Sequence, residues 1–378
     1  VPIGALAVGL LAVPWVTGSP APPFALAPAP EAPDERPPLV LIVLDTMRAD
    51  HLSIYGYERA TDPEIARFAA AATVFEQVLS PGDMTLSSHA SMFTGEFPVR
   101  HGAHPDSGSL PLAATTLAEH LRDAGYATVG ISSNCGWIGG THGVSQGFDY
   151  YDARCARSPF KHRGPVFLGD RVTASVRTWL FPDHTSWEWR DAGDIAVEAL
   201  AALDALAERR APFFLFLNFM DVHAPIHPPE PYFSMFPRSA ERFDPTWGFG
   251  EFRELVRRGE PVPPEALEYI AATYDGAMAY ADHHVGRVLG RLRELGLHDA
   301  AAIAVASDHG EGFGDNDVFG HGSSVRHAVT RVPLILKLPG QREGRRVATP
   351  VSTADLFPTF LEVAGLRVPD GVGGVRPR

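Results

Sequence analysis

The 378-residue chain is poor in residues on which several large classes of protein depend. It has only two cysteines, Cys135 and Cys155, which is too few for a disulfide-rich scaffold, and it has no CxxC spacing for a zinc site. Two free or buried thiols are the favoured interpretation, with a single disulfide as the alternative. No basic run or stripe is present and the formal net charge is −13, so no nucleic-acid partner is expected.

Residues 1–17 are apolar but lack the basic residues that open a secretory leader. Their run is short for a membrane span of about 20 residues, and Pro14 interrupts it. The length suits the apolar part of a signal peptide, and Ala25-Leu26-Ala27 is similar to a cleavage site. We therefore expect a signal or membrane segment and an extracytoplasmic protein, periplasmic or membrane-anchored. The end of a longer membrane domain and a buried core segment are the alternatives.

A Pro- and Ala-rich stretch, residues 18–38, predicts an extended linker to a folded domain over 39–368, with 369–378 as a tail. Apolar runs typical of strands buried on both faces lie at Leu39–Leu44, 126–132, 212–219, 301–307 and 332–338. Helical patterns lie at 62–72, 115–124, 191–209, 264–295 and 353–364. This alternation predicts an α/β fold with a mostly parallel sheet covered on both sides. Residues 156–190 and 225–262 lack periodicity and are interpreted as insertions or lids.

Polar side chains follow several of the predicted strands. Asp45 follows the first, Ser133-Asn134 the second, Asp221 and His223 the third, and Asp308-His309 the fourth. Ligands of open α/β sheets bind beyond the carboxyl ends of the strands, so these residues should meet at one edge. A buried carboxylate is costly unless it is paired or metal-bound, and carboxylate with imidazole suits a divalent cation. Turn capping is the alternative for both aspartates.

Thr85 precedes a predicted helix over residues 86–93, which Gly95 should end. The threonine could simply cap this helix. Placed against a metal held by Asp45, Asp308 and His309, its hydroxyl would instead be activated as a nucleophile, and the helix dipole would favour the developing anion.

Several blocks of the sequence occur together and in order. They are LVLIVLDTMRADHLSIYGY, TLSSHASMFTG with EFPVRHG, YDGAMAYADHHVG, SDHGEGFGD with FGHGS, and RVPLILKLPG with VSTADLFPTFLEVAG. In these blocks the chain resembles sulfatase-like proteins of the alkaline phosphatase superfamily over about residues 38–368. The resemblance implies an alkaline-phosphatase-like three-layer sandwich, and it implies that the small C-terminal subdomain of the family is absent from this sequence.

The site motif departs from that of the sulfatases, which carry C/S-x-P-S-R and convert its first residue to formylglycine. Thr85 stands at that position and cannot be converted, and His89 stands at the arginine. The paired aspartates become Asp45-Thr46 and the Asp-Asn pair becomes Asp308-His309. His321-Gly322 resembles the Lys-Gly that contacts the sulfate, and His223 resembles the substrate-contacting histidine. The resemblance thus implies a metal site of Asp45, Thr85, Asp308 and His309, and catalytic roles for Thr85, His89, His223 and His321.

These residues predict a hydrolase of sulfate or phosphate esters that uses one divalent ion: Ca, Mg, Mn or Zn. A second ion held by Asp221, His223 and His227 is the less favoured arrangement. The substrate is expected to be a small-molecule, lipid or glycan ester. The set Asp, Thr, Asp, His also resembles phosphodiesterases, phosphonate hydrolases and membrane-anchored phosphoethanolamine or phosphoglycerol transferases, and a non-catalytic pseudo-enzyme is a further alternative. A structural role is the alternative for His89, and His283 and His284 are expected at the surface.

Overall fold

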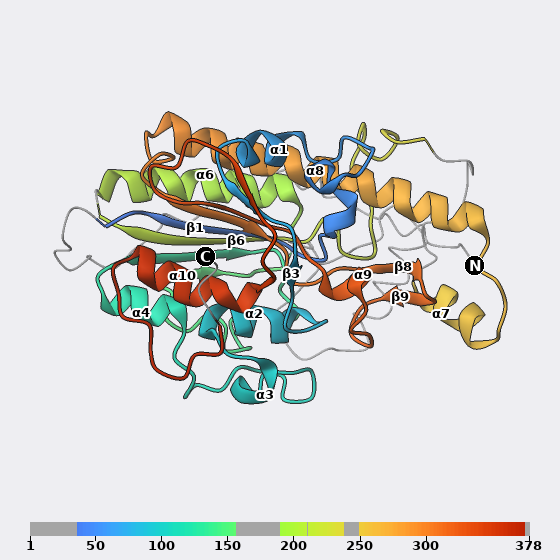
Figure 1. The fold of residues 1–378 in the computed structure, drawn as a ribbon, viewed down its shortest axis with the longest axis horizontal. Coiled ribbons are helices and arrows are strands. Elements are labelled where there is room, and N and C mark those ends of the chain that lie inside the picture. The colour runs from blue at the N-terminus through green and yellow to red at the C-terminus, as the bar shows by residue number, and fades with distance from the viewer. Residues whose placement is uncertain (1–35, 156–189, 210, 238–248, 375–378) are drawn as a thin grey trace, which may run out of the picture.

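The computed structural model describes residues 36–155, 190–209, 211–237 and 249–374. The predicted signal or membrane segment, most of the linker and most of the insertion at 156–190 therefore lie outside the described residues. An eight-stranded sheet in the order β11-β2-β10-β7-β1-β6-β4-β5 forms the centre of the molecule (Figure 1). In the part of the chain that the structure describes, no helix is long and apolar enough to span a membrane.

The predicted strands form the middle of this sheet. β1 (Leu39–Leu44), six buried aliphatic residues, lies between β6 (Phe213–Phe219) and β7 (Ala302–Ala306), and β4 (Ala127–Ser132) pairs with β6. All three pairings are parallel, so the predicted adjacency is confirmed and the carboxyl ends share one edge. β10 (Leu334–Lys337), also predicted as a strand, runs antiparallel to β7.

The remaining strands are short. β2 (Thr73–Phe75), β5 (Tyr150–Asp152) and β11 (Arg345–Val347) complete the large sheet. β12 (Val351–Ser352) pairs with β3 (Val78–Leu79), and β8 (Gly312–Asp315) forms a hairpin with β9 (Val318–Gly320). Runs of two to four residues carry too little periodicity for prediction from sequence.

Helices cover both faces of the sheet. One layer holds α1 (Pro63–Ala69), α6 (Ala192–Arg209) and α8 (Pro264–Glu294), and the other holds α2 (Thr85–Thr94), α4 (Leu117–Asp123) and α10 (Leu356–Val363) (Figure 1). Val40, Ile42 and Leu44 pack into the first layer, whereas Leu39, Leu41 and Val43 pack into the second. This alternation is the side-chain period of a strand, and it gives the predicted three-layer α/β sandwich.

Shorter helical elements complete the fold. They are η1 (Ala49–His51), η2 (Ser53–Tyr55), α3 (Pro98–His101), α7 (Phe249–Arg257), α9 (His327–Thr330) and η3 (Thr353–Asp355). The helix predicted at 353–364 is thus divided into η3 and α10. The segment 225–262, expected to be irregular, contains α7, which packs on β9 through stacked rings of Phe252 and Phe319.

The two cysteines form a disulfide, so the favoured interpretation of free thiols is wrong. Cys135 follows β4 and Cys155 follows β5, and the two Cα atoms are 5.2 Å apart. Because β4 and β5 are parallel neighbours, residues 20 positions apart reach the same edge of the sheet. The sequence alone carried no sign of that pairing.

A buried carboxylate of α8 caps α1. Asp282 accepts hydrogen bonds from the backbone N–H groups of Glu64 and Ile65, at 2.9 and 2.8 Å, while Asp62 at the N-cap position makes no side-chain cap. Burial raises the pKa of Asp282 to about 7, despite those two hydrogen bonds.

The two histidines that follow Asp282 differ in exposure. His283 is exposed as expected, but His284 is buried with 7% exposure, so the surface prediction for His284 is wrong.

Asp282→Asn is expected to change how stability depends on pH. The pKa of Asp282 is higher in the folded state than the value of about 3.9 in the unfolded chain. The contribution of Asp282 to the free energy of unfolding is therefore fully present below pH ~4 and is lost as the pH rises through about 7. Relative to Asp282→Asn, the free energy of unfolding of the wild type should fall by up to about 1.4 kcal/mol per pH unit in that window. Urea denaturation at pH 5, 6, 7 and 8 measures it. Asp106→Asn, at an exposed position, should keep the wild-type slope; the same slope in Asp282→Asn would contradict the assignment.

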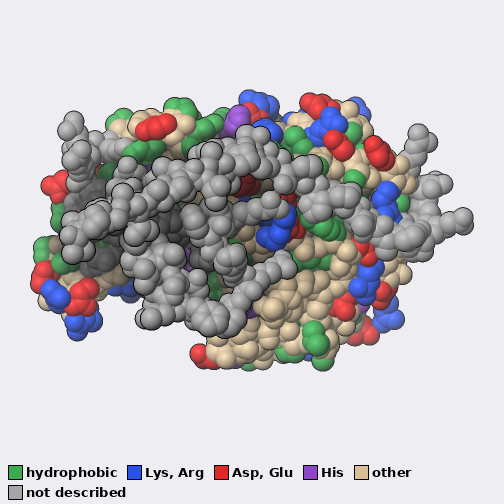
Figure 2. Space-filling view, turned by 180° about the vertical axis from the view of Figure 1, so that it is seen from behind, with side chains coloured by type: hydrophobic (Ala, Val, Ile, Leu, Met, Phe, Trp, Pro, Cys, Tyr) green, Lys and Arg blue, Asp and Glu red, His purple; other side chains and the backbone are tan. Residues whose placement is uncertain are grey.

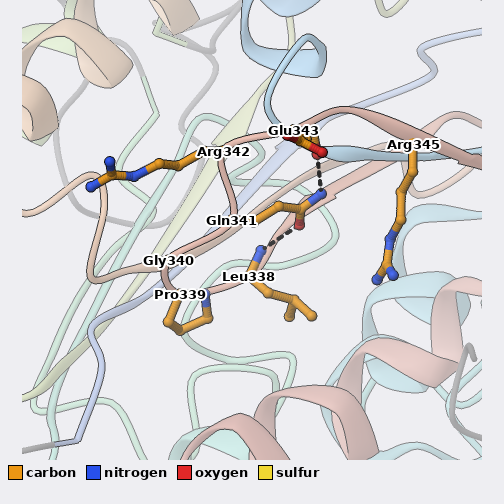
Figure 3. A pocket seen from close by; sticks show the side chains of 7 residues that line it. All are labelled: Leu338, Pro339, Gly340, Gln341, Arg342, Glu343 and Arg345. Carbon is orange, nitrogen blue, oxygen red and sulfur yellow. Dashed lines mark hydrogen bonds between the residues drawn. The ribbon is translucent and has the colours of Figure 1, made fainter.

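A surface pocket of about 550 Å³ lies in the loop after β10, lined by residues 338–343 and Arg345 (Figure 3). The Gln341 side chain spans it, accepting from the N–H of Leu338 at 3.1 Å and donating to the carbonyl of Glu343 at 3.0 Å. β10 is antiparallel to β7, so this loop lies at the amino ends of the parallel strands. The pocket is therefore at the opposite end of the sheet from Asp45 and Asp308. Figure 2 shows the molecule from the side opposite to Figure 1. Among the described residues at the edges of this view, acidic and basic side chains are mixed.

Candidate metal centre and active site

Three of the predicted metal ligands meet at the carboxyl edge of the sheet. Asp45 follows β1, and Asp308 and His309 follow β7. All three are fully buried, and one ligand atom from each lies within 4.8 Å of the others. His309 Nε2 is 3.4 Å from Asp308 Oδ2 and 3.8 Å from Asp45 Oδ1. These side chains converge at the edge of the sheet that their positions in the sequence predict as the site.

Hydrogen bonds fix the side chains of Asp308 and His309. Asp308 Oδ1 accepts from the backbone N–H groups of His309, at 2.8 Å, and of Thr46, at 3.2 Å. His309 Nδ1 lies 3.0 Å from the carbonyl of Gly310, to which it donates. His309 Nε2 then carries a lone pair that faces Asp308 Oδ2.

The atoms of the cluster that have no hydrogen-bond partner are suited to bind a cation. Asp45 Oδ1 and Asp308 Oδ2 are buried and have no hydrogen-bond partner. Burial, together with the charge of Asp45, raises the pKa of Asp308 well above its ordinary value, and burial lowers the pKa of His309. Two unpartnered carboxylate oxygens beside an uncharged imidazole are costly, and a divalent ion would remove that cost. Carboxylate oxygen and imidazole nitrogen are ligands that such ions accept.

Thr85 lies beside this cluster as the first residue of α2. Its Oγ1 is 3.3 Å from His309 Nε2, and the residue is 1% exposed. Met84 holds the N-cap position and no side chain caps the helix, so the interpretation of Thr85 as the cap is wrong. Gly95 ends the helix with a φ of 68°, a left-handed conformation that favours glycine, as predicted. The hydroxyl therefore faces the predicted ligands from the positive end of a helix.

His89 lies one turn further along α2, in the interior. Its Nδ1 is 2.9 Å from the carbonyl of Thr85 and 3.5 Å from Asp308 Oδ2. The side chain is fully buried against the ring edges of Phe93 and Phe216, and burial lowers its pKa. His89 thus contacts the backbone of Thr85 and the side chain of Asp308, a candidate ligand.

A row of histidine rings extends from the cluster. The His321 ring centroid is 4.4 Å from that of His309 and 4.9 Å from that of His223. Glu311, fully buried and not singled out in the sequence analysis, lies 2.9 Å from His321 Nδ1. Burial alone would lower the pKa of His321, but the charge and hydrogen bond of Glu311 outweigh it and the pKa is raised. Glu311 thereby favours the protonated, positively charged form of the His321 ring. The Nε2 atom of that ring lies on the side away from Glu311.

The residues proposed for a second ion are not brought together in the same way. His227 is exposed, with its ring 5.1 Å from that of Phe233. Asp221 accepts a hydrogen bond from the N–H of Ala192 at the start of α6, and burial raises its pKa to about 7. Within the described ranges, Asp45, Asp308 and His309 are the one group with metal-ligand spacing. The second ion remains a prediction.

The sequence matches a family model described as "Sulfatase" over residues 37–366. The chain belongs to the sulfatase family. The resemblance drawn from the ordered blocks is thereby confirmed, and the expectation of a sulfuric or phosphoric ester hydrolase is confirmed at the level of the family.

Curated relatives of this sulfatase-family chain include an arylsulfatase from Clostridium perfringens, 26% identical, with 90% of this chain and 77% of the relative covered. The mouse steryl-sulfatase is 28% identical, with 92% and 65% covered. An ulvan-active sulfatase from Formosa agariphila is 25% identical, with 90% and 64% covered. The chain thus spans just under two thirds of the length of the latter two.

Solved structures share the fold of this family member. The phosphonate monoester hydrolase of Silicibacter pomeroyi superimposes with a TM-score of 0.67 at 23% identity, covering 90% of this chain and 76% of that one. A protein solved in complex with its substrate D-glucosamine-2-N,6-O-disulfate gives 0.68 at 19% identity, covering 90% and 79%. At these identities the likeness establishes the alkaline-phosphatase-like fold.

Proposed function

We propose that this chain is a metal-dependent hydrolase of sulfate or phosphate esters, with Thr85 as the nucleophile. Asp45, Thr85, Asp308 and His309 would hold one divalent ion: Ca, Mg, Mn or Zn. The observation that carries the proposal is the pair of buried, unpartnered carboxylate oxygens beside His309 Nε2 and a helix-start hydroxyl. A pseudo-enzyme would have no need to keep such a costly arrangement.

The chain's own residues account for the chemistry as follows. A bound divalent ion would supply positive charge that favours the alkoxide form of Thr85 and the charge of the transition state. Thr85 Oγ1 attacks phosphorus or sulfur, a new O–P or O–S bond forms, and the bond to the leaving oxygen breaks. His321, held by Glu311, donates a proton to that oxygen, and His223 beside it contacts the substrate. Water then attacks phosphorus or sulfur and gives a proton to His321, and the bond to Thr85 Oγ1 breaks, so that both residues return to the state in which they began.

The identity of the nucleophile favours the phosphate branch of this proposal. A threonine cannot become formylglycine, whereas a threonine ester of phosphate is a sound covalent intermediate. The same intermediate could pass its group to an alcohol, so a phosphoethanolamine- or phosphoglycerol-type transferase is the second candidate. The substrate is proposed to be a small-molecule, lipid or glycan ester.

An extracytoplasmic location belongs to the same proposal. The Cys135–Cys155 disulfide supports it, because disulfides persist in oxidising compartments. Residues 1–17 would serve as the signal or membrane segment, residues 18–38 as the linker and residues 39–368 as the catalytic domain.

A panel of esters tests the function. An aryl sulfate, a phosphodiester and a phosphonate would each be offered to metal-depleted enzyme and to enzyme supplied with Ca, Mg, Mn or Zn. We expect turnover of at least one ester, abolished by chelation and restored by a divalent ion. Metal-independent turnover, or none with any ester and ion, would refute the proposal.

Glu311→Gln tests the state of His321. Removing the carboxylate removes the charge that raises the pKa of His321, so this pKa should fall. If protonated His321 is needed, the alkaline limb of the kcat/KM profile should move to lower pH by about one unit or more. Glu260→Gln, an exposed change, should leave the profile in place. An unmoved alkaline limb in Glu311→Gln would exclude His321 as the proton donor.

A further inference from the structure

Asn134 is a buried amide that follows β4 and contacts the cluster. It is 3% exposed, and its Nδ2 donates to Asp45 Oδ2 at 3.0 Å. Ser133, the neighbouring residue, turns away and donates instead to the carbonyl of Arg190. Of the two polar residues after β4, only Asn134 therefore makes a hydrogen bond to a candidate metal ligand.

The orientation of the Asn134 amide is fixed by its own turn. Its Oδ1 accepts from the N–H of Gly136 at 3.2 Å and of Trp137 at 2.9 Å. Only the oxygen end of the amide can accept these bonds, so the NH₂ end must face Asp45. The disulfide begins at the next residue, Cys135, and ties this loop to the end of β5.

We propose that Asn134 is a positioning residue that leaves Asp45 with a single oxygen for the cation. The inference rests on the proposed metal site. With Oδ2 occupied by the amide, only Oδ1 of Asp45 is free, just as two N–H bonds on Oδ1 of Asp308 leave only its Oδ2. A neutral N–H is suited to this task, because a lysine or arginine there would compete with the cation for the carboxylate.

Cobalt(II) is a suitable probe, since the intensity of its visible bands falls as its coordination number rises. Asn134→Ser keeps an oxygen that can accept from the N–H of Trp137 but cannot reach Asp45, and Asn134→Ala removes both interactions. In both variants Asp45 Oδ2 becomes available as a second ligand atom. We expect weaker cobalt(II) binding by about 10-fold or more and less intense bands than in the wild type. Asn316→Ser, the same change at an exposed asparagine, should behave as the wild type.

Each outcome separates this inference from the proposed function. A wild type that binds no cobalt(II) or other divalent ion would refute the metal site itself. A wild type that binds, together with an Asn134→Ser variant of unchanged affinity and spectrum, would overturn the role of Asn134 alone. If the cobalt(II) affinity and spectrum change in Asn134→Ala but not in Asn134→Ser, the role of Asn134 is to hold its turn, and the inference is again overturned. Near-UV circular dichroism of the metal-free proteins checks the fold.

A measurement on the wild type covers the case in which the variants do not fold. The chain has three asparagines, Asn134, Asn218 and Asn316, so selective ¹⁵N labelling gives three pairs of side-chain NH₂ signals. Asn134 and Asn218 are both buried, so both of their signals should be protected from exchange, and the signals assigned to Asn134 should shift when zinc is added. If the Asn134 signals do not respond to zinc that is demonstrably bound, the inference is overturned.

Discussion

Thr85→Ala is expected to lower turnover by about three orders of magnitude or more while the fold is kept, because the reaction loses its attacking atom. The change removes a hydroxyl that lies 3.3 Å from His309 Nε2 but caps nothing in α2. Steady-state kinetics on an ester found in the panel measure it. Thr94→Ala, at the other end of the same helix, is the matched control and should retain near-wild-type turnover.

Two further results would identify the covalent step. Thr85→Ser should retain part of the activity, because a primary hydroxyl can occupy the same place. Mass spectrometry of enzyme quenched during turnover should find a phosphoryl or sulfuryl group on the peptide that carries Thr85. Full activity in Thr85→Ala would mean that Thr85 is only a helix residue and that another group attacks the ester.

Asp308→Ala is expected to abolish uptake of the divalent ion, and turnover with it. The change removes one of the two unpartnered oxygens, leaving Asp45 and His309 as the remaining charged or imidazole ligands. Elemental analysis after dialysis against each ion measures uptake. Asp299→Ala, at an exposed side chain before β7, is the control and should keep the wild-type metal content.

Asp308→Asn separates loss of a ligand from loss of structure. The amide can still accept the two backbone N–H bonds, yet it no longer adds a buried charge beside Asp45. We therefore expect the metal-free Asp308→Asn protein to unfold at a higher temperature than the metal-free wild type, while its metal uptake is lost. Unchanged metal content in either Asp308 variant would refute the assignment of the site.

The sequence predicted the centre of the fold better than its edges. Leu39–Leu44 has six consecutive aliphatic residues, and such a run has few structural outcomes other than a strand buried on both faces. The two-residue strand β3 and the reversed direction of β10 depend on pairings between distant segments that no local pattern reports. His284 is buried because Tyr280 and Arg287 contact it, although its neighbour His283 is exposed.

The position of a site residue was predicted where it follows a strand, as for Asp45, Asn134 and Asp308, but the contact through which one residue acts on another was not. Asp45, Asp308 and His309 follow apolar runs, so their convergence could be expected from topology. Glu311 and Asn134 act on His321 and Asp45 through single hydrogen bonds between segments far apart in the chain. The one signal for Glu311 was an acidic residue between glycines directly after Asp308-His309, and that pattern is common in exposed turns.

The position of β1 in the sheet also has a consequence for how the chain is made. β1 is synthesised long before both of its neighbours, because Leu39 pairs with Phe214 of β6, 175 positions later, and β7 follows later still. At a translation rate of about 5–20 residues per second, that interval lasts roughly 9 to 35 s. Throughout it, six uncharged aliphatic residues with strong strand propensity have no sheet to join. The nascent chain therefore exposes an aggregation-prone segment until the second half of the protein emerges, which is the state that chaperones recognise.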